Sequence, residues 1–283
     1  MKTVNSISGG KSSAYIACNY PADYNVFALV RVEDKQCRFK DDYLRGKVED
    51  RIQEPFIGTV EMDEIITTIF DLEQHIGKKI DWVTGPTFEQ VIRNKGEYLP
   101  NKAARFCTTE LKIRPIFHYL HSQNALPCEM RLGFRAGEEK RLIKKQKKCD
   151  KNGIEHFKAT FGKHKEGRHE GNNKWETVRF QKPVAPLIDD RIYREDVNRY
   201  FEDKNITFAE MNNCVGCWWR NEPLLNTMYQ KRPNKFEWFN RIEQTHKGTF
   251  KDGITYEEIK NANFTLDLDF NDFSGCDSGY CGV

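Results

Sequence analysis

Short apolar segments alternate with longer, partly charged segments over the first 140 residues of the chain. The apolar segments predict strands at residues 3–8, 26–32, 56–60, 80–84 and 130–134. Helices are predicted at residues 11–20, 39–52, 63–76 and 189–203. Strands that alternate with helices predict an α/β fold with a parallel, doubly wound sheet and helices on both faces. Such a sheet binds ligands at the carboxyl ends of its strands.

The pattern loosens after residue 139, and the composition changes with it. Residues 139–180 contain 13 lysines and arginines against six acidic residues, although the whole chain has a net charge of only +3. We interpret this segment as a basic insertion with no predicted secondary structure. It is either a solvated loop or a surface that contacts the phosphates of tRNA or DNA. We expect a nucleotide-binding domain over residues 1–205, which contains the insertion, and a cysteine-rich C-terminal region over residues 206–283.

Bulk properties predict a cytoplasmic protein that does not enter a membrane. The mean hydropathy is −0.75, and no apolar segment approaches the roughly 20 residues that a membrane span needs. The first residues lack the pattern of a secretory signal. The nine cysteines are therefore expected to be thiols, catalytic groups or metal ligands rather than disulfides.

The first predicted strand runs into a glycine loop, Ser8-Gly9-Gly10-Lys11-Ser12-Ser13. Glycines let the backbone approach a phosphate closely, and the amides at the start of the following helix attract its charge. Lys11 adds a cation, and the serines add hydroxyl donors. Asn5 stands where a Walker A loop would need glycine, and the dinucleotide fingerprint is absent. The alternative is a plain glycine turn with a capping serine.

The glycine loop resembles the PP-loop, SGGxDS, of the ATP pyrophosphatases and adenine nucleotide alpha hydrolases, with Ser12 in place of the aspartate. Four later segments are similar to those of the phosphoadenosine phosphosulfate (PAPS) reductase-like branch of that superfamily. They lie at residues 105–115, 133–141, 186–197 and 213–217. The resemblance implies an enzyme that binds ATP, or the sulfonucleotides PAPS or APS, with Mg²⁺ as a candidate companion ion. ATP would be cleaved between its α and β phosphates.

Within the resemblance, Lys11 is the expected catalytic cation of the loop. Arg135 and Arg141 suit bidentate contacts with phosphate or sulfate, although surface salt bridges would also explain them. Lys112 lies near a cysteine in the sequence, where it could lower the pKa of the thiol or neutralise an anion.

Five cysteines are candidate metal ligands. Cys214 and Cys217 have the spacing that metals use, and the others are Cys107, Cys276 and Cys281. All-thiolate coordination suits a [4Fe–4S] cluster or zinc; the resemblance favours the cluster, and buried free thiols are the alternative. Cys281 also resembles the tail cysteine that is the nucleophile of sulfonucleotide reductases. We favour metal ligation for Cys281, because Thr108 replaces one cysteine of the pair found in the family.

Three functions follow from these features. The favoured one is ATP activation coupled to sulfur transfer or nucleic-acid modification. The second is a sulfonucleotide reductase, and the third is a non-catalytic module that binds a nucleotide or a nucleic acid. Release of pyrophosphate would separate the first function from the other two.

Overall fold

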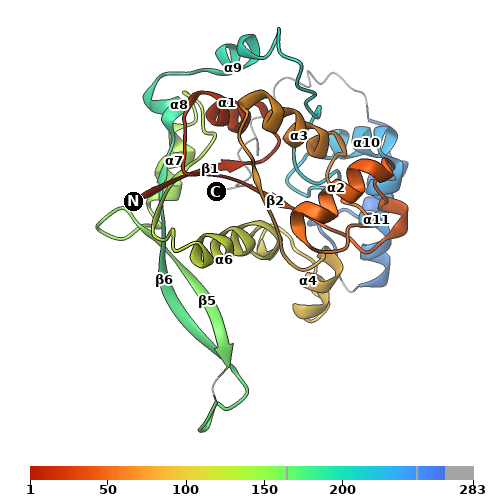
Figure 1. Ribbon diagram of the computed structural model, residues 1–283. Coiled ribbons are helices and arrows are strands. Elements are labelled where there is room, and N and C mark those ends of the chain that lie inside the picture. The colour runs from red at the N-terminus through yellow and green to blue at the C-terminus, as the bar shows by residue number, and fades with distance from the viewer. Residues whose placement is uncertain (164, 247, 265–283) are drawn as a thin grey trace.

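A six-stranded, mostly parallel sheet forms the centre of the protein (Figure 1). The computed structural model describes residues 1–163, 165–246 and 248–264. The strand order is β3 (Asp81–Thr84), β2 (Tyr24–Leu29), β1 (Lys2–Ile7), β4 (Cys128–Arg131), β6 (Asn173–Val184) and β5 (Glu155–Lys163). Only β5 runs antiparallel to its neighbour. The first strand therefore lies inside the sheet, and its carboxyl end carries the glycine loop.

Helices pack on both faces of the sheet because the inner strands are apolar on both sides. In β2, Phe27 and Leu29 belong to one buried cluster, and Val26 and Ala28 belong to another. The first cluster includes residues of α1 (Lys11–Asn19), α2 (Asp42–Ile52) and α3 (Glu64–Ile76). The second includes residues of α6 (Arg114–Ser122). An α/β protein with a mostly parallel sheet is thus confirmed.

Three predicted elements differ from the observed ones. The strand predicted at residues 56–60 is wrong, because Gly58 makes single bridges to Val32 and Arg38 instead of a ladder. The helix predicted at residues 39–52 begins only after Asp41, whose side chain accepts a hydrogen bond from the amide of Leu44. The helix predicted at residues 189–203 is shorter, α9 (Arg194–Tyr200), and it is separated from the preceding α8 (Pro186–Asp189) by a turn in which Arg191 adopts φ +55°.

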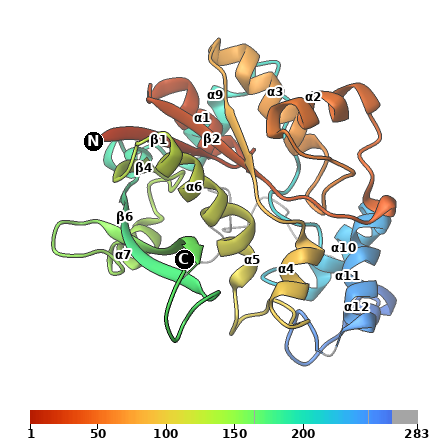
Figure 2. The ribbon, with the colours of Figure 1, turned by 60° about the horizontal axis from the view of Figure 1, so that its bottom comes forward.

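The basic insertion is ordered, which corrects our expectation of no secondary structure. It forms α7 (Glu139–Gln146) and the hairpin of β5 and β6, which projects from the body of the protein (Figures 1 and 2). Phe157 and Phe180 of the hairpin pack against Phe117 of α6. Lys145 is buried and pairs with Glu155 at 2.7 Å, so this lysine supports the fold and is not available to a polynucleotide.

The described part of the C-terminal region is helical and aromatic. It contains α10 (Glu222–Lys231), α11 (Pro233–Thr245) and α12 (Tyr256–Asn261). Their buried rings share one cluster with Val30, Val60 and Leu111 from the first part of the chain. The remaining elements are η1 (Lys35–Cys37), α4 (Phe88–Asn94), α5 (Phe106–Thr108) and the π-helical turn η2 (Thr109–Ile113). Among the described helices, none is long and apolar enough to cross a membrane.

Candidate nucleotide and cysteine site

The glycine loop requires its first glycine. Gly9 has a φ of +78°, and a Cβ placed on it would lie 2.6 Å from Cγ2 of Ile65 in α3. A side chain at this position would therefore be strained by the backbone and would also collide with the helix that packs on the loop. Gly10 follows as the residue that caps α1. The chain thus turns sharply from β1 into α1 and directs the start of the helix at the carboxyl edge of the sheet.

Ser13 holds the glycine loop closed. Its hydroxyl accepts a hydrogen bond from the amide of Ser8 at 3.1 Å and donates one to the carbonyl of Gly10 at 2.9 Å. The hydroxyl oxygens of Ser8 and Ser13 are 3.1 Å apart. The amides from Gly10 to Ser13 have no carbonyl partner within the helix, as at every helix start, and they carry the positive end of its dipole. The loop can therefore bind an anion with its backbone.

The structure brings the segment at residues 133–141, which contains Arg135 and Arg141, next to the glycine loop. A Cβ placed on Gly133 would lie 3.2 Å from both Cβ of Ser12 and the amide nitrogen of Ser13. The hydroxyl of Ser12 is buried and has no hydrogen-bond partner within the described part of the chain. The segment at residues 133–141 thus begins in direct contact with the glycine loop, although the two are far apart in the sequence.

Arg135 and Arg141 share one acid, Glu138. The Nε of Arg135 lies 3.2 Å from the Glu138 carboxylate, and a terminal nitrogen of Arg141 lies 2.5 Å from it. Burial raises the pKa of Glu138. The amide of Arg135 and the two guanidinium groups lower this pKa by more than burial raises it, so it lies below its ordinary value. The salt bridges that the sequence offered as the alternative role of Arg135 and Arg141 are therefore present. Because a guanidinium has five donors, the same arginines can still serve an oxyanion.

Lys11 contacts a helix that the sequence did not associate with it. Its ammonium donates to the side-chain oxygen of Asn198 in α9 at 3.1 Å and lies 5.8 Å from the ring centre of Phe208. The lysine thus bridges α1 and α9 in this structure. Its role as the catalytic cation stays a prediction.

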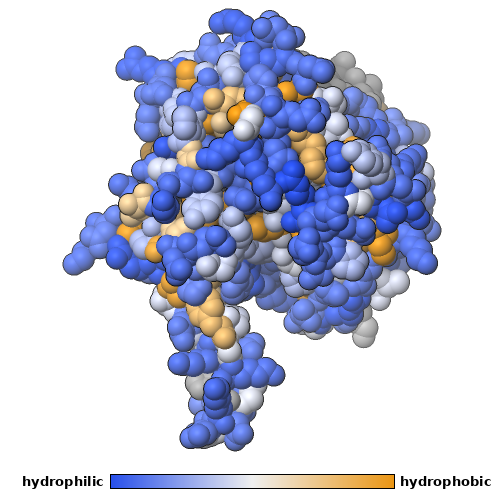
Figure 3. All heavy atoms as spheres, in the orientation of Figure 1, coloured by the Kyte–Doolittle hydropathy of each residue, from blue (hydrophilic) through white to orange (hydrophobic). Residues whose placement is uncertain are grey.

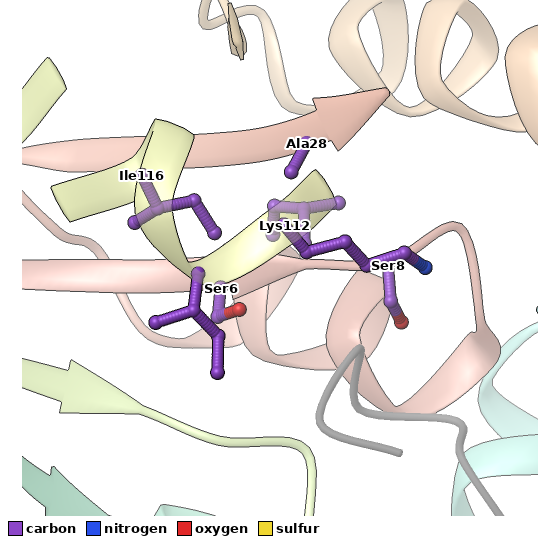
Figure 4. Close-up of a pocket in the computed structure, with 7 residues that line it drawn as sticks. Ser6, Ser8, Ala28, Lys112 and Ile116 are labelled. Carbon is purple, nitrogen blue, oxygen red and sulfur yellow. The ribbon is translucent and has the colours of Figure 1, made fainter. Parts of the chain in front are cut away.

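A small pocket opens beside the glycine loop and contains a second lysine. Figure 4 shows this pocket, which Lys112 of η2 lines together with Ser6, Ser8, Ala28 and Ile116. The Lys112 ammonium pairs with the carboxylate of Glu61 at 2.7 Å. Glu61 is only 2% exposed. A cation and a buried acid therefore lie near the carboxyl ends of β1 and β2.

The cysteine loop, Cys214–Cys217, adjoins this ion pair and is fixed by backbone and side-chain contacts. Glu61 and Cys214 form an antiparallel bridge, and the amide of Val215 donates to the carbonyl of Val60 at 2.8 Å. The hydroxyl of Tyr256 donates to the carbonyl of Gly216 at 2.7 Å. A Cβ at Gly216 would lie 2.3 Å from the ring of Phe239, so only glycine fits there.

Cys107 joins Cys214 and Cys217 in one group. Burial, together with the neighbouring Cys217, raises the pKa of Cys107 to about 11, although Thr108 and Arg105 oppose this rise. Burial also raises the pKa of Cys214 well above its ordinary value, with a further increase from Glu61 and from the two other thiols, whereas Lys112 lowers it. Arg105 stacks 4.9 Å from the ring centre of Trp219 and so links the Cys107 segment to the cysteine loop.

These thiols suit a soft metal by their chemistry. The cysteines of the described chain, seven in number, are all free. Across residues 1–163, 165–246 and 248–264, no three cysteine, histidine or acidic side chains converge closely enough to form a metal site. Cys276 and Cys281 lie outside the described residues, so their assignment as ligands, and that of Cys281 as nucleophile, stays a prediction. Cys107, Cys214 and Cys217 would provide three thiolates to a [4Fe–4S] cluster or to zinc.

Metal uptake at this group is expected to strengthen steeply with pH. Because the pKa values of Cys107 and Cys214 are raised, both thiols keep their protons near neutral pH, and a metal must displace them. The protons displaced from these two thiols alone make the apparent affinity rise at least about a hundredfold per pH unit. Cd²⁺ titrations, followed by thiolate-to-metal absorption at about pH 6.5 and 7.5, measure this slope.

Two variants test the site of uptake. Cys214→Ser should abolish the absorption band, while Cys149→Ser, a partly buried cysteine outside the group, should retain it. A pH-independent affinity, or a Cys214→Ser protein with full uptake, would exclude this group as the binding site.

Sequence reasoning missed Glu61, Asn198 and the role of Glu138. Glu61 follows the mostly apolar residues 56–60 directly. An isolated acid at the end of a buried segment could have indicated a functional residue. Asn198 carried no such signal, because its contact with Lys11 depends on how α9 packs against α1.

The comparisons with known proteins add no relative. No protein-family model, curated protein or solved structure matches this chain.

Proposed function

We propose that this protein is a PP-loop enzyme of the PAPS reductase-like type, which binds ATP at the glycine loop and cleaves it to AMP and pyrophosphate. The cleavage would activate an acceptor for sulfur transfer or nucleic-acid modification. The cysteine group beside the nucleotide would hold a [4Fe–4S] cluster or zinc. A cytoplasmic location is part of this proposal.

One observation carries the proposal. The Lys112–Glu61 pair connects the two parts of the site: Lys112 lines the pocket at Ser8, and Glu61 pairs in backbone register with Cys214. A nucleotide at the glycine loop and a group bound by Cys214 would therefore share one cation. This arrangement suits an enzyme that couples nucleotide chemistry to the cysteines better than it suits two unrelated sites.

The fold supports the same proposal. The glycine loop follows an inner strand and begins a helix, and helices pack on both faces of the sheet. These features suit a doubly wound, adenine nucleotide alpha hydrolase-like fold, in which ligands bind at the carboxyl edge. The loop amides and Lys11 would hold the departing phosphates, with Mg²⁺ as a companion ion, and Arg135 and Arg141 would contact the remaining oxyanion.

In the proposed reaction, a nucleophilic atom of the acceptor attacks the α-phosphorus of ATP. The bond from that phosphorus to the bridging oxygen breaks, and pyrophosphate leaves with the electron pair. The positive charge of the loop amides and of Lys112 would stabilise the charge that develops on the phosphates.

The products of ATP turnover test this function. We expect ATP labelled in the γ position to yield labelled pyrophosphate, and ATP labelled in the α position to yield AMP or an adenylated acceptor. Chromatography of both reactions distinguishes these products from ADP and orthophosphate. Formation of ADP would contradict the proposal, and reduction of PAPS or APS to sulfite without use of ATP would favour the sulfonucleotide reductase instead.

A further inference from the structure

The hairpin of β5 and β6, here called the arm, carries two of the large exposed aromatic side chains of the described chain. Trp175 is 48% exposed and Phe161 is 44% exposed. Figure 3 shows apolar residues gathered near the base of the arm and a hydrophilic tip. The apolar part therefore lies where the arm meets the body of the protein, beside α6.

The two faces of the arm differ in charge. Directly opposed residues of an antiparallel pair point to the same side, and neighbours along a strand point to opposite sides. The register pairs Thr160 with Trp175, Lys158 with Thr177, and His156 with Arg179. One face thus carries Trp175 with Lys158, Arg179 and His156, whereas Glu176 pairs with Ala159 on the other face.

Arg114, at the start of α6, lies close to this face of the arm. The guanidinium of Arg114 lies 5.8 Å from the ring centre of Trp175 and 5.1 Å from that of Phe157, and it also pairs with Glu110. The ammonium of Lys158 lies 5.8 Å from the Trp175 ring.

Acidic groups near the arm are mostly engaged in pairs. Glu155 pairs with the buried Lys145 at 2.7 Å, and Glu176 lies 3.6 Å from Lys174. Asp150 lies 3.6 Å from His156 at the base of the arm. The face around Trp175 therefore retains the charge of Lys158 beside an exposed indole, with Arg179 farther along β6, where Asp150 lies close enough to interact with it.

We propose that this face of the arm is a docking surface for a single-stranded polynucleotide. Bases stack on the exposed Trp175 ring, as on the aromatic platforms of single-strand binders, and the backbone phosphates contact Lys158 and Arg179. A duplex hides its base faces within the stack, so the ring favours a single strand over a duplex. The inference goes beyond the proposed function, because binding at the arm requires neither ATP nor the cysteines.

Fluorescence anisotropy with the full-length protein, without ATP, tests the surface. The probes are labelled oligo(dT) and oligo(U) of about 20 nucleotides, long enough to cover the roughly 4–16 nucleotides that such proteins occupy, and a duplex of the same length. We expect the single strands to bind more tightly than the duplex. Trp175→Ala should weaken binding at least about fivefold, and Trp175→Phe should restore most of it because a stacking ring remains.

Charge variants and controls complete the experiment. Lys158→Glu and Arg179→Glu should each weaken binding and lower the salt slope by about one. The matched controls are Tyr98→Ala, an aromatic residue with 71% exposure outside the arm, and Lys40→Glu, an exposed lysine; both should bind as the wild type does. The proposal is overturned by an absence of binding at about 50 mM salt, by tighter binding of the duplex, or by an unchanged Trp175→Ala protein.

Preference between the two single strands identifies the sugar of the bound polymer. A result that contradicts polynucleotide binding at the arm can be distinguished from one that contradicts the proposed function. Loss of polynucleotide binding in Trp175→Ala leaves the nucleotide site intact, and pyrophosphate release is measured on a separate ATP substrate.

Discussion

Gly9→Ala is expected to abolish nucleotide binding and pyrophosphate release while the protein remains folded. The backbone at Gly9 has a φ of +78°, where an L-residue costs about 1–3 kcal/mol, and the added methyl group would lie 2.6 Å from Ile65. The loop can relieve this contact only by moving away from α3, and its amides then lose their common direction. Calorimetric titration with ATP and a pyrophosphate assay measure the effect.

A second glycine provides the matched control for this variant. Gly46 lies within α2, and a Cβ placed on it would meet nothing within 4 Å. Gly46→Ala should therefore raise the free energy of unfolding by about 0.5–1 kcal/mol and leave ATP binding unchanged. Wild-type affinity in Gly9→Ala would show that the glycine loop is a structural turn and not a phosphate site.

Lys112→Met is expected to lower both stability and activity. The change leaves the Glu61 carboxylate in a buried position without the ammonium that lies 2.7 Å from it. Loss of one partner of a buried ion pair costs about 3–5 kcal/mol, and the nucleotide pocket also loses a cation. Chemical denaturation measures the free energy of unfolding, and ATP titration of the remaining folded protein measures the second effect.

A double variant separates these two effects. Adding Glu61→Gln to Lys112→Met removes the buried charge, so most of the stability should return while nucleotide affinity stays low. Lys231→Met breaks an exposed pair with Glu210 and should cost at most about 1 kcal/mol. A Lys112→Met protein as stable as Lys231→Met would contradict the importance of the buried pair.

Local patterns in the sequence predict the central part of the fold well. The strands at the start of the chain are short and apolar, and the glycine loop and the break at Pro21 define α1 on both sides. The segment at residues 56–60 has a similar apolar composition, yet it lies across the backbone of Cys37 and Arg38, where Gly58 leaves no room for a strand ladder. Apolar composition alone does not distinguish a buried strand from a buried extended connection.

The arm was missed for a different reason. Phe157, Ala159 and Phe161 alternate with polar residues, which is the period of a half-buried strand, but the high charge of the segment favoured a solvated loop. The charge lies mainly on the face directed to solvent, and the apolar positions pack against α6. In this segment periodicity was more informative than net composition.

The candidate site could be predicted only in its separate pieces. The glycine loop, Arg135, Arg141 and the cysteine spacing are each visible locally. That Lys112 pairs with Glu61, or that Cys107 lies beside Cys217, depends on how distant segments are brought together by the sheet and the aromatic cluster. No single sequence feature specifies those distances.

The shared aromatic cluster has a consequence for how the molecule holds together. The rings of α11 and α12 pack with Val30, which follows directly on β2, and with Val60, which directly precedes Glu61. The described chain after residue 206 therefore buries its rings against the chain before it, and the two parts share this one cluster. If the C-terminal helices opened, the residues that pack around Glu61 and Cys214 would be exposed to solvent together. The pocket at Lys112 and the thiol group should therefore lose their order as one cooperative unit.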